Sequence, residues 1–180
     1  RQKHTQLIER LLSNYMDLGI SGKTALVSAS SAGLGFASAQ ALAEAGCKTV
    51  ISGRNEERLM HAANKIPNSI PVIADVSTVK GSQALVQDAK SQLGTNIDIL
   101  ITNAGGPPAG TFASTDVDQY LTAIELNLMS VVAMCKETVP DMQEKKWGRV
   151  LAITSISVRQ PIPNIMLSNT ARAGVTGFLK

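Results

Sequence analysis

Short runs of small and branched apolar residues alternate along the chain with longer segments that place apolar residues at helical spacing. The runs predict strands at 24–30, 48–54, 69–76, 96–105 and 148–157. The longer segments predict helices at 33–46, 55–66, 78–94 and 116–146, and a last helix from 167. Asn55 is expected to cap its helix, and Pro140 to break or bend the long one. This alternation is typical of an α/β fold, a doubly wound parallel sheet with helices on both faces.

The first fifteen residues stand apart from this pattern. Leu7, Leu11 and Tyr15 share a helical stripe, and a new start follows at Met16. We interpret residues 1–15 as an N-terminal extension, either a segment that is not native or an amphipathic helix that packs on the domain or on a partner. Residues 16–180 are expected to form a single domain, which the helical pattern at its end leaves incomplete at the C-terminus.

Composition and charge narrow the function classes. The net charge is +3 and the basic residues are scattered, with no run longer than Lys145 and Lys146, which argues against a nucleic-acid surface. Cys47 and Cys135 lie in no metal-ligand spacing, so we expect reduced thiols in a cytoplasmic protein and no metal site. No stretch approaches the roughly 18 apolar residues of a membrane span. With 44% hydrophobic and 3% aromatic residues, small aliphatic side chains must build the interior.

Ligands of open parallel sheets bind at the carboxyl ends of the strands. The first predicted strand is followed by SASSAGLG, residues 28–35, in which Gly33 and Gly35 open a helix. Small residues there allow backbone N–H groups to approach a phosphate, and the hydroxyls of Ser30 and Ser31 can add donors. The alternative is a tight turn that requires positive φ.

Arg54 follows the second predicted strand. An acidic residue at this position would accept hydrogen bonds from a ribose 2′-OH, whereas an arginine pairs with a 2′-phosphate. Arg54 therefore favours NADP(H) over NAD(H) as the cofactor. The alternative is a surface arginine paired with Glu56 or Glu57.

Two further strand ends carry candidate cofactor contacts. Asp75 can accept from an adenine amino group while Val76 covers a ring face; the alternative for Asp75 is a turn or helix-cap residue. Asn103 begins NAGG, residues 103–106, where small residues permit close approach to a ribose.

From Gly22 to Lys180 the chain resembles the short-chain dehydrogenase/reductase family, and most of all its 3-oxoacyl-carrier-protein-reductase-like branch. The resemblance rests on NAGG, on Asn127 in ELNLMS, on GRVLAITSIS and on the last helix. It implies a Rossmann-type sheet, binding of NAD(P)(H) and interconversion of carbonyls and alcohols. It also implies a homodimer or homotetramer through the helices at 116–146 and 166–180, and one or two further strands beyond the last residue.

The resemblance assigns roles to individual residues. The cofactor set is Ser28, Ser30, Ser31, Gly33, Leu34 and Gly35 at the pyrophosphate, Arg54 at the 2′-phosphate, Asp75 and Val76 at the adenine, and Asn103, Ala104 and Gly105 at the ribose. Ala29 stands where the family has its first glycine, and we expect binding to survive. Asn127 would hold a water of a proton relay, and Ser155 would bond the substrate carbonyl. Ser168 and Arg172 stand where the family has a Tyr and a Lys four residues apart.

The Ser168 and Arg172 pair changes the expected chemistry. A serine hydroxyl is a far weaker acid than a phenol, whose pKa is about 10, and an arginine does not exchange its proton. One interpretation is an NADP(H)-dependent oxidoreductase with an atypical site, whose proton comes from water, from Ser155 and Ser168, or from the substrate. The alternative is a weak or inactive NADP(H)-binding sensor or partner subunit, in which Ser168 caps a helix and Arg172 packs or lies at the surface.

The substrate class rests on two segments expected to border the cleft. GGPPAGTF (105–112) and VRQPIPNIML (158–167) are stiffened by prolines and carry apolar side chains. They are compatible with a small apolar or acyl substrate, and equally with core packing or a subunit interface.

Overall fold

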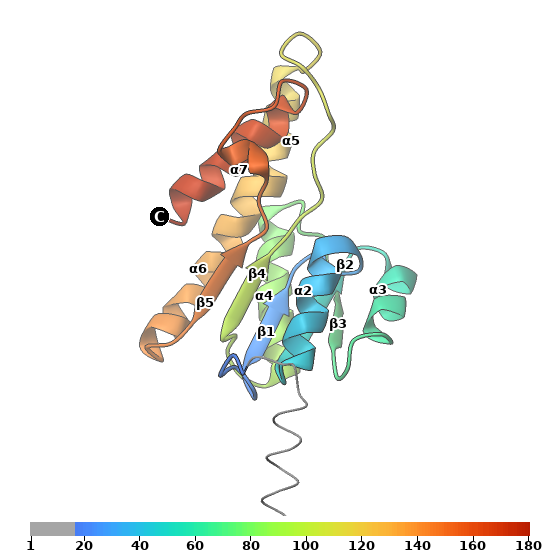
Figure 1. Cartoon of the computed structure of the whole chain (residues 1–180), viewed down its shortest axis with the longest axis vertical. Coiled ribbons are helices and arrows are strands. Elements are labelled where there is room, and N and C mark those ends of the chain that lie inside the picture. Colours follow the sequence, from blue (N-terminus) through green and yellow to red (C-terminus); the bar gives the residue numbers. More distant parts are fainter. Residues whose placement is uncertain (1–16) are drawn as a thin grey trace, which may run out of the picture.

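The computed structural model describes residues 17–180, and its strands and helices alternate as predicted. The strands are β1 (Thr24–Val27), β2 (Lys48–Gly53), β3 (Ile70–Ile73), β4 (Ile99–Thr102) and β5 (Arg149–Ala152). The helices are α2 (Gly33–Glu44), α3 (Glu56–Ala63), α4 (Val79–Leu93), α5 (Val117–Ile124), α6 (Ser130–Glu144) and α7 (Met166–Phe178) (Figure 1). The predicted extension over residues 1–15 lies outside the described residues. Within residues 17–180, every helix is too short or too polar to cross a membrane.

The five strands form one parallel sheet in the order β3-β2-β1-β4-β5. The chain winds outward in one direction from β1 to β3 and then crosses back to β4 on the other side of β1. The order therefore reverses between β1 and β4, which places the expected ligand crevice at the carboxyl ends of these two strands. The predicted α/β fold with a doubly wound sheet is confirmed.

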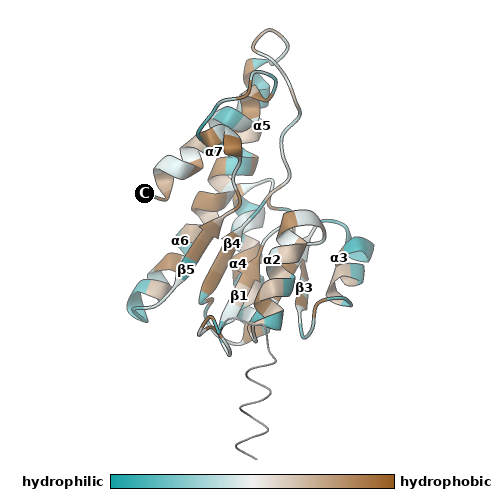
Figure 2. Ribbon diagram, in the orientation of Figure 1, coloured by the Kyte–Doolittle hydropathy of each residue, from teal (hydrophilic) through white to brown (hydrophobic). Residues whose placement is uncertain are grey.

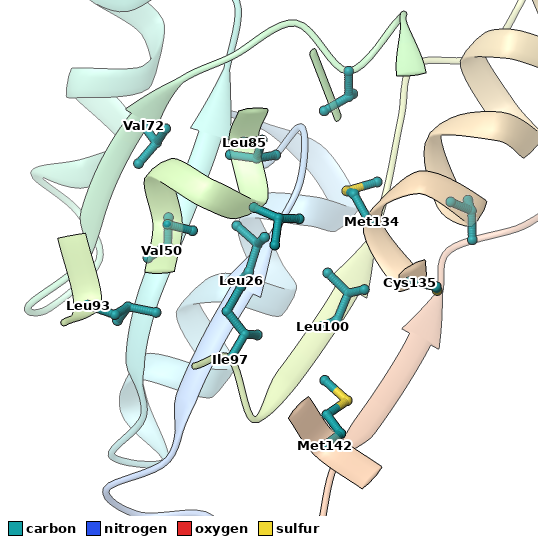
Figure 3. Close-up of a cluster of buried hydrophobic side chains, with 14 of the residues drawn as sticks. Leu26, Val50, Val72, Leu85, Leu93, Ile97, Leu100, Met134, Cys135 and Met142 are labelled. Carbon is teal, nitrogen blue, oxygen red and sulfur yellow. The ribbon is translucent and has the colours of Figure 1, made fainter. Parts of the chain in front are cut away.

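The core has two layers because successive side chains of a strand point to opposite faces of the sheet. On β1, Leu26 joins a cluster with Leu85 of α4 and Met134 of α6 (Figure 3). Its neighbour Val27 joins a second cluster with Leu59 of α3 on the opposite face. The hydrophobic residues of Figure 2 accordingly concentrate on the strands, while hydrophilic residues lie on the outer helices. Burying both faces holds the strand ends, and the turns that follow them, in fixed positions.

The predicted helix at 116–146 is interrupted, but not where the sequence indicated. A π-helical turn at Glu125–Met129 separates α5 from α6, and Pro140 lies inside α6, which continues to Glu144. Proline removes one backbone hydrogen bond, and the buried Thr138 and Met142 on either side hold the helix against the core. The expected break at Pro140 is therefore wrong. The expected cap by Asn55 is confirmed, since its side chain accepts from the Arg58 backbone N–H at 2.8 Å.

Candidate cofactor and active site

A cleft of about 440 Å³ lies at the carboxyl ends of the strands, at the point where the sheet order reverses. Several of the predicted cofactor residues meet there, namely Ser31, Arg54, Asp75, Val76, Asn103, Ala104 and Gly105. They come from four separate turns of the chain. The parallel sheet is what brings them together, because it carries the turn after each strand to the same edge.

The turn after β1, which the sequence predicts to bind a phosphate, contains two residues in the left-handed region of backbone conformation. Ala29 and Gly33 both adopt positive φ, 45° and 60°. Such a conformation costs a residue with a side chain about 1–2 kcal/mol. Neighbouring segments of the same chain hold Ala29 in place. Its N–H donates to Ser52 Oγ at 3.1 Å, and its carbonyl accepts from Asn103 Nδ2 at 2.9 Å. The turn is therefore braced from both β2 and β4.

Two of the predicted serines face the protein interior. Ser30 Oγ donates to the Val27 carbonyl at 2.7 Å and accepts from Ser52 N–H at 3.0 Å. Ser28 Oγ exchanges hydrogen bonds with the Asn103 backbone at 2.7 and 2.8 Å. Both side chains are 0% exposed. The expectation that the Ser30 hydroxyl donates to a phosphate is therefore wrong: Ser28 and Ser30 shape the turn, and Ser31 lines the cleft.

The start of α2 packs directly against this turn. An added Cβ at Gly35 would lie 2.7 Å from Asn103 Nδ2 and 2.8 Å from the Ala29 carbonyl oxygen. Gly33 has open space around it, and a glycine is favoured at this position because the backbone adopts positive φ. Leu34 between them is exposed and does not line the cleft. Gly35 thus allows the backbone of the helix start to approach the turn, as a phosphate cradle requires.

At the other end of the cleft, Arg54 faces Asp75. Arg54 Nε lies 4.0 Å from Asp75 Oδ1, and the two side chains are 74% and 53% exposed. The same Asp75 oxygen accepts from Ser77 N–H at 3.0 Å, so Asp75 also serves as a turn residue, while the cap of α4 is Thr78. Among residues 17–180, neither Glu56 nor Glu57 forms the ion pair with Arg54 that was considered from the sequence.

Sequence reasoning missed Arg58, which lines the same cleft from the first turn of α3. Its position follows from the Asn55 cap, which makes residue 58 the third residue of the helix. The signal that could have found it was present, because Arg54 and Arg58 stand on either side of a recognised cap. A helix that starts at the sheet edge directs the side chains of its first turn toward the strand ends.

Three of the four residues predicted for catalysis, Asn127, Ser155 and Arg172, lie around the end of β5. Arg172 of α7 donates through Nη1 to the Ile153 and Thr154 carbonyls, at 2.8 and 3.2 Å. Burial lowers its pKa from the ordinary arginine value. Arginine nevertheless keeps its charge near neutral pH. Its guanidinium therefore holds the chain that leads from β5 to Ser155, and the alternative of a surface arginine is wrong.

A small cavity of about 10 Å³ is lined by Arg172, Asn127 and Thr102 together with apolar side chains. Asn127, in the π-helical turn, is 3% exposed and donates to the Gly105 carbonyl at 3.0 Å. Within residues 17–180, Asn127 Oδ1 and Thr102 Oγ1 are buried and have no hydrogen-bond partner. These two polar atoms and a cavity of this size suit at most a single water molecule.

Ser155 and Ser168 differ in their surroundings. Ser155 Oγ accepts from Ser157 N–H at 3.1 Å, which leaves its own proton free to donate. Ser168 is half-buried on α7 and, like Ser155, lines neither cavity. The helix starts after Ile165, so the alternative in which Ser168 caps it is wrong.

The two segments expected to border the substrate cleft are joined to each other. Gly110 N–H donates to the Asn164 carbonyl at 2.8 Å, and Met166 N–H donates to the Gly110 carbonyl at 3.2 Å. Asn169 holds the second segment through the backbone of Ile162, to whose carbonyl it donates at 2.8 Å. The segments thus form one continuous wall beside the start of α7.

The reversed strand order and the glycine-containing turn after β1 define a Rossmann-type α/β fold. The chain belongs to the short chain dehydrogenase family, whose profile matches residues 23–180. This family likeness agrees with the resemblance seen in the sequence.

Curated relatives match most of this chain and part of their own length. Uncharacterized oxidoreductase YvaG from Bacillus subtilis is 35% identical over 153 residues, 81% of this chain and 56% of the relative. Nodulation protein G from Azospirillum brasilense is 33% identical over 178 residues, 89% of this chain and 67% of the relative. Granaticin polyketide synthase putative ketoacyl reductase 1 from Streptomyces violaceoruber is 32% identical, with coverages of 87% and 59%.

Two solved structures share the fold and were determined with NADPH. L-sorbose reductase from Gluconobacter frateurii, complexed with NADPH and L-sorbose, has a TM-score of 0.85 at 32% identity, covering 91% of this chain and 64% of that one. A variant actinorhodin polyketide ketoreductase with NADPH has a TM-score of 0.80 at 27% identity, covering 87% and 62%.

Proposed function

We propose that this protein is an NADP(H)-dependent oxidoreductase that acts on a carbonyl/alcohol pair through an atypical active site. The observation that carries the proposal is the basic end of the cleft, where Arg54 and Arg58 stand beyond β2. A nucleotide with an extra phosphate on its ribose suits two arginines better than a nucleotide without one. Relatives named as ketoacyl reductases and a sorbose reductase bound to NADPH support the same reading.

The residues of the cleft suit the cofactor from one end to the other. The turn before Gly35 would hold the pyrophosphate. Because Gly35 has no Cβ, the backbone at the start of α2 can lie close to the backbone of this turn. Asp75 and Val76 would meet the adenine, and the Asn103 turn the ribose next to the nicotinamide. NADPH, when bound, supplies the hydride.

The chain itself must then supply a proton to the carbonyl oxygen. Ser155 is suited to hold that oxygen, since its hydroxyl proton is free. Arg172 does not exchange its proton and is held by the Ile153 and Thr154 carbonyls just beyond β5, so it positions Ser155 and does not relay a proton. The proton is left to water at the Asn127 cavity or to the serine hydroxyls. Weak general acid catalysis is expected to slow turnover by about 10²–10⁴ relative to a tyrosine.

The commitment of Arg172 to two backbone carbonyls favours a second candidate, an NADP(H)-binding sensor or partner subunit with little turnover. NADPH oxidation by the purified full-length protein separates the two candidates. A panel of small ketones and 3-oxoacyl thioesters covers the small apolar or acyl substrates that the sequence favours. Cofactor consumption that depends on the ketone supports the oxidoreductase. NADPH binding with no consumption across the panel overturns it in favour of the sensor.

We also propose that the protein is a homodimer or homotetramer that assembles through α5, α6 and α7. Exposed apolar side chains on α5 and α7 support such an interface, namely Val117, Leu121 and Phe178.

Gly35→Ala is expected to weaken NADPH binding by about 10- to 100-fold, because overpacking by one methyl group costs about 1–3 kcal/mol. The added Cβ would push α2 away from Asn103 and the Ala29 carbonyl, and so distort the phosphate turn. The Kd from a fluorescence titration measures the effect. Gly177→Ala is the matched control, since a Cβ there meets nothing within 4 Å. Unchanged affinity in Gly35→Ala would show that the pyrophosphate lies elsewhere.

A further inference from the structure

Asn169, near the start of α7, binds one residue of the preceding segment with both ends of its side-chain amide. Its Nδ2 donates to the Ile162 carbonyl at 2.8 Å, and its Oδ1 accepts a longer bond from the Ile162 N–H at 3.4 Å. Ile162 stands between Pro161 and Pro163, and proline has no backbone N–H. Asn169 therefore binds the one backbone N–H of residues 161–163, which we call the proline corner.

Asn169 shares one face of α7 with Arg172, three residues further along the helix. Both side chains bond the backbone of the connection from β5 to α7, and α7 runs back along this connection (Figure 1). Arg172 binds the start of the connection, at the two carbonyls just beyond β5, and Asn169 binds it near its end, at Ile162. Ser155 lies between these two points of attachment. The helix therefore holds the connection on both sides of the Ser155 hydroxyl.

The proline corner is also joined to the loop that follows β4. The Gly110 N–H donates to the carbonyl of Asn164, next to the corner, at 2.8 Å, and the Gly110 carbonyl accepts from the Met166 N–H at 3.2 Å. Each proline fixes its own φ and restricts the residue before it, so the corner has little freedom to bend. A displacement of the corner would therefore shift both segments of the wall together.

We propose that Asn169 is a positioning residue that holds the proline corner on α7 and thereby fixes the wall beside which a carbonyl substrate binds. The inference rests on the proposed function, because it takes the wall to face the substrate of that reaction. A wall held in one place favours ligands whose shape matches it. The bonds at Ile162 would therefore decide how well a ketone binds, and the chemistry at the Ser155 hydroxyl would not depend on them.

Asn169→Ala removes both bonds to Ile162 and is expected to raise the KM of ketone reduction about 10-fold, because the wall is no longer held. The kcat is expected to stay within about threefold, because Arg172 still holds the start of the connection. The Kd of NADPH is expected to stay within about twofold, because Asn169 lies outside the lining of the cofactor cleft.

Two further variants separate the role of the bonds from a general effect on α7. Asn169→Asp keeps the size of the side chain and its acceptor but loses the donor of the shorter bond, so KM is expected to rise in this variant too. Thr170→Ala is the matched control, since it removes a side-chain hydrogen bond from the exposed face of the same turn. There the Thr170 Oγ1 donates to the Met166 carbonyl at 3.0 Å.

Hydrogen exchange of the backbone amides at 158–166 follows the wall itself, independently of turnover. In Asn169→Ala, exchange there is expected to become about 10-fold faster, while the amides of β4 keep their protection.

Faster exchange together with a raised KM and an unchanged kcat supports the inference. If the unmodified protein reduces ketones, equal KM values in Asn169→Ala and Thr170→Ala overturn the inference and leave the proposed function standing. A raised KM without faster exchange also overturns it, because Asn169 would then act on the substrate directly. A kcat that falls as far as KM rises has the same consequence, because the bonds would then serve the chemistry. Absence of ketone-dependent NADPH consumption by the unmodified protein overturns the proposed function, and the inference with it.

Discussion

Arg54→Asp is expected to weaken NADPH binding about 30- to 100-fold while NADH binding changes by less than about threefold. The substitution exchanges a cation for an anion and places a second carboxylate beside Asp75. Two carboxylates repel a 2′-phosphate, but either can accept a hydrogen bond from a ribose hydroxyl. The expected loss of NADPH affinity is smaller than for a buried arginine, because Arg54 is largely exposed and water screens its charge.

Separate titrations with NADPH and NADH measure this difference at a fixed ionic strength. Lys65→Asp serves as the control for charge reversal outside the cleft. An equal loss of affinity for both cofactors would contradict the assignment of Arg54 to the 2′-phosphate. Because added salt screens exposed charges, the preference of the unmodified protein for NADPH is expected to shrink as salt is added.

The double substitution Ser168→Tyr with Arg172→Lys is expected to raise the kcat of ketone reduction by about 10²–10⁴. A phenol has a pKa of about 10 and can be brought lower by a nearby ammonium group and an oxidised nicotinamide, whereas a serine hydroxyl cannot be brought near neutrality. Both substitutions are needed, because the Arg172 guanidinium is bound to the carbonyls of Ile153 and Thr154. A lysine at that position retains one donor group that can turn toward the cofactor ribose.

The matched control replaces Ser168 by Phe in the same Arg172→Lys background, which adds the ring without its hydroxyl. The tyrosine variant should be faster than the phenylalanine variant at equal NADPH saturation. Its rate should also fall as pH rises through the pKa of the phenol, because the acid form donates the proton. Equal rates in the two variants would contradict the view that the missing acid limits this site.

The order of the elements could be read from the sequence because each strand is a compact apolar run. β1 and β4 are buried along their whole length, and three of the four residues of each strand are apolar. Their predicted ends extended too far for one reason: the small residues that follow, such as Ser28 and Asn103, fit a strand pattern but turn away to form the cleft. Residues that form a binding site can depart from strand geometry even where the local sequence pattern still predicts a strand.

Other features depend on contacts between distant parts of the chain. The π-helical turn surrounds Asn127, whose side chain binds the Gly105 carbonyl twenty-two residues earlier. Helical periodicity continues through that turn, so proline was the only visible reason for a break. The inward direction of Ser30 depends on Ser52, on the neighbouring strand. Arg58 was missed as a cleft residue because the Asn55 cap already accounted for this segment, and the cap involves only the backbone N–H of Arg58.

The central claim is that the cleft between the strand ends holds NADP(H). Titration of the unmodified full-length protein with NADPH and, separately, with NADH tests it most directly, followed through the fluorescence of the reduced cofactor. We expect saturable binding with NADPH preferred by at least about 10-fold, as two arginines at the 2′-phosphate require. Equal affinity for the two cofactors would contradict the role of the basic wall, and absence of binding would remove the cofactor from the account altogether.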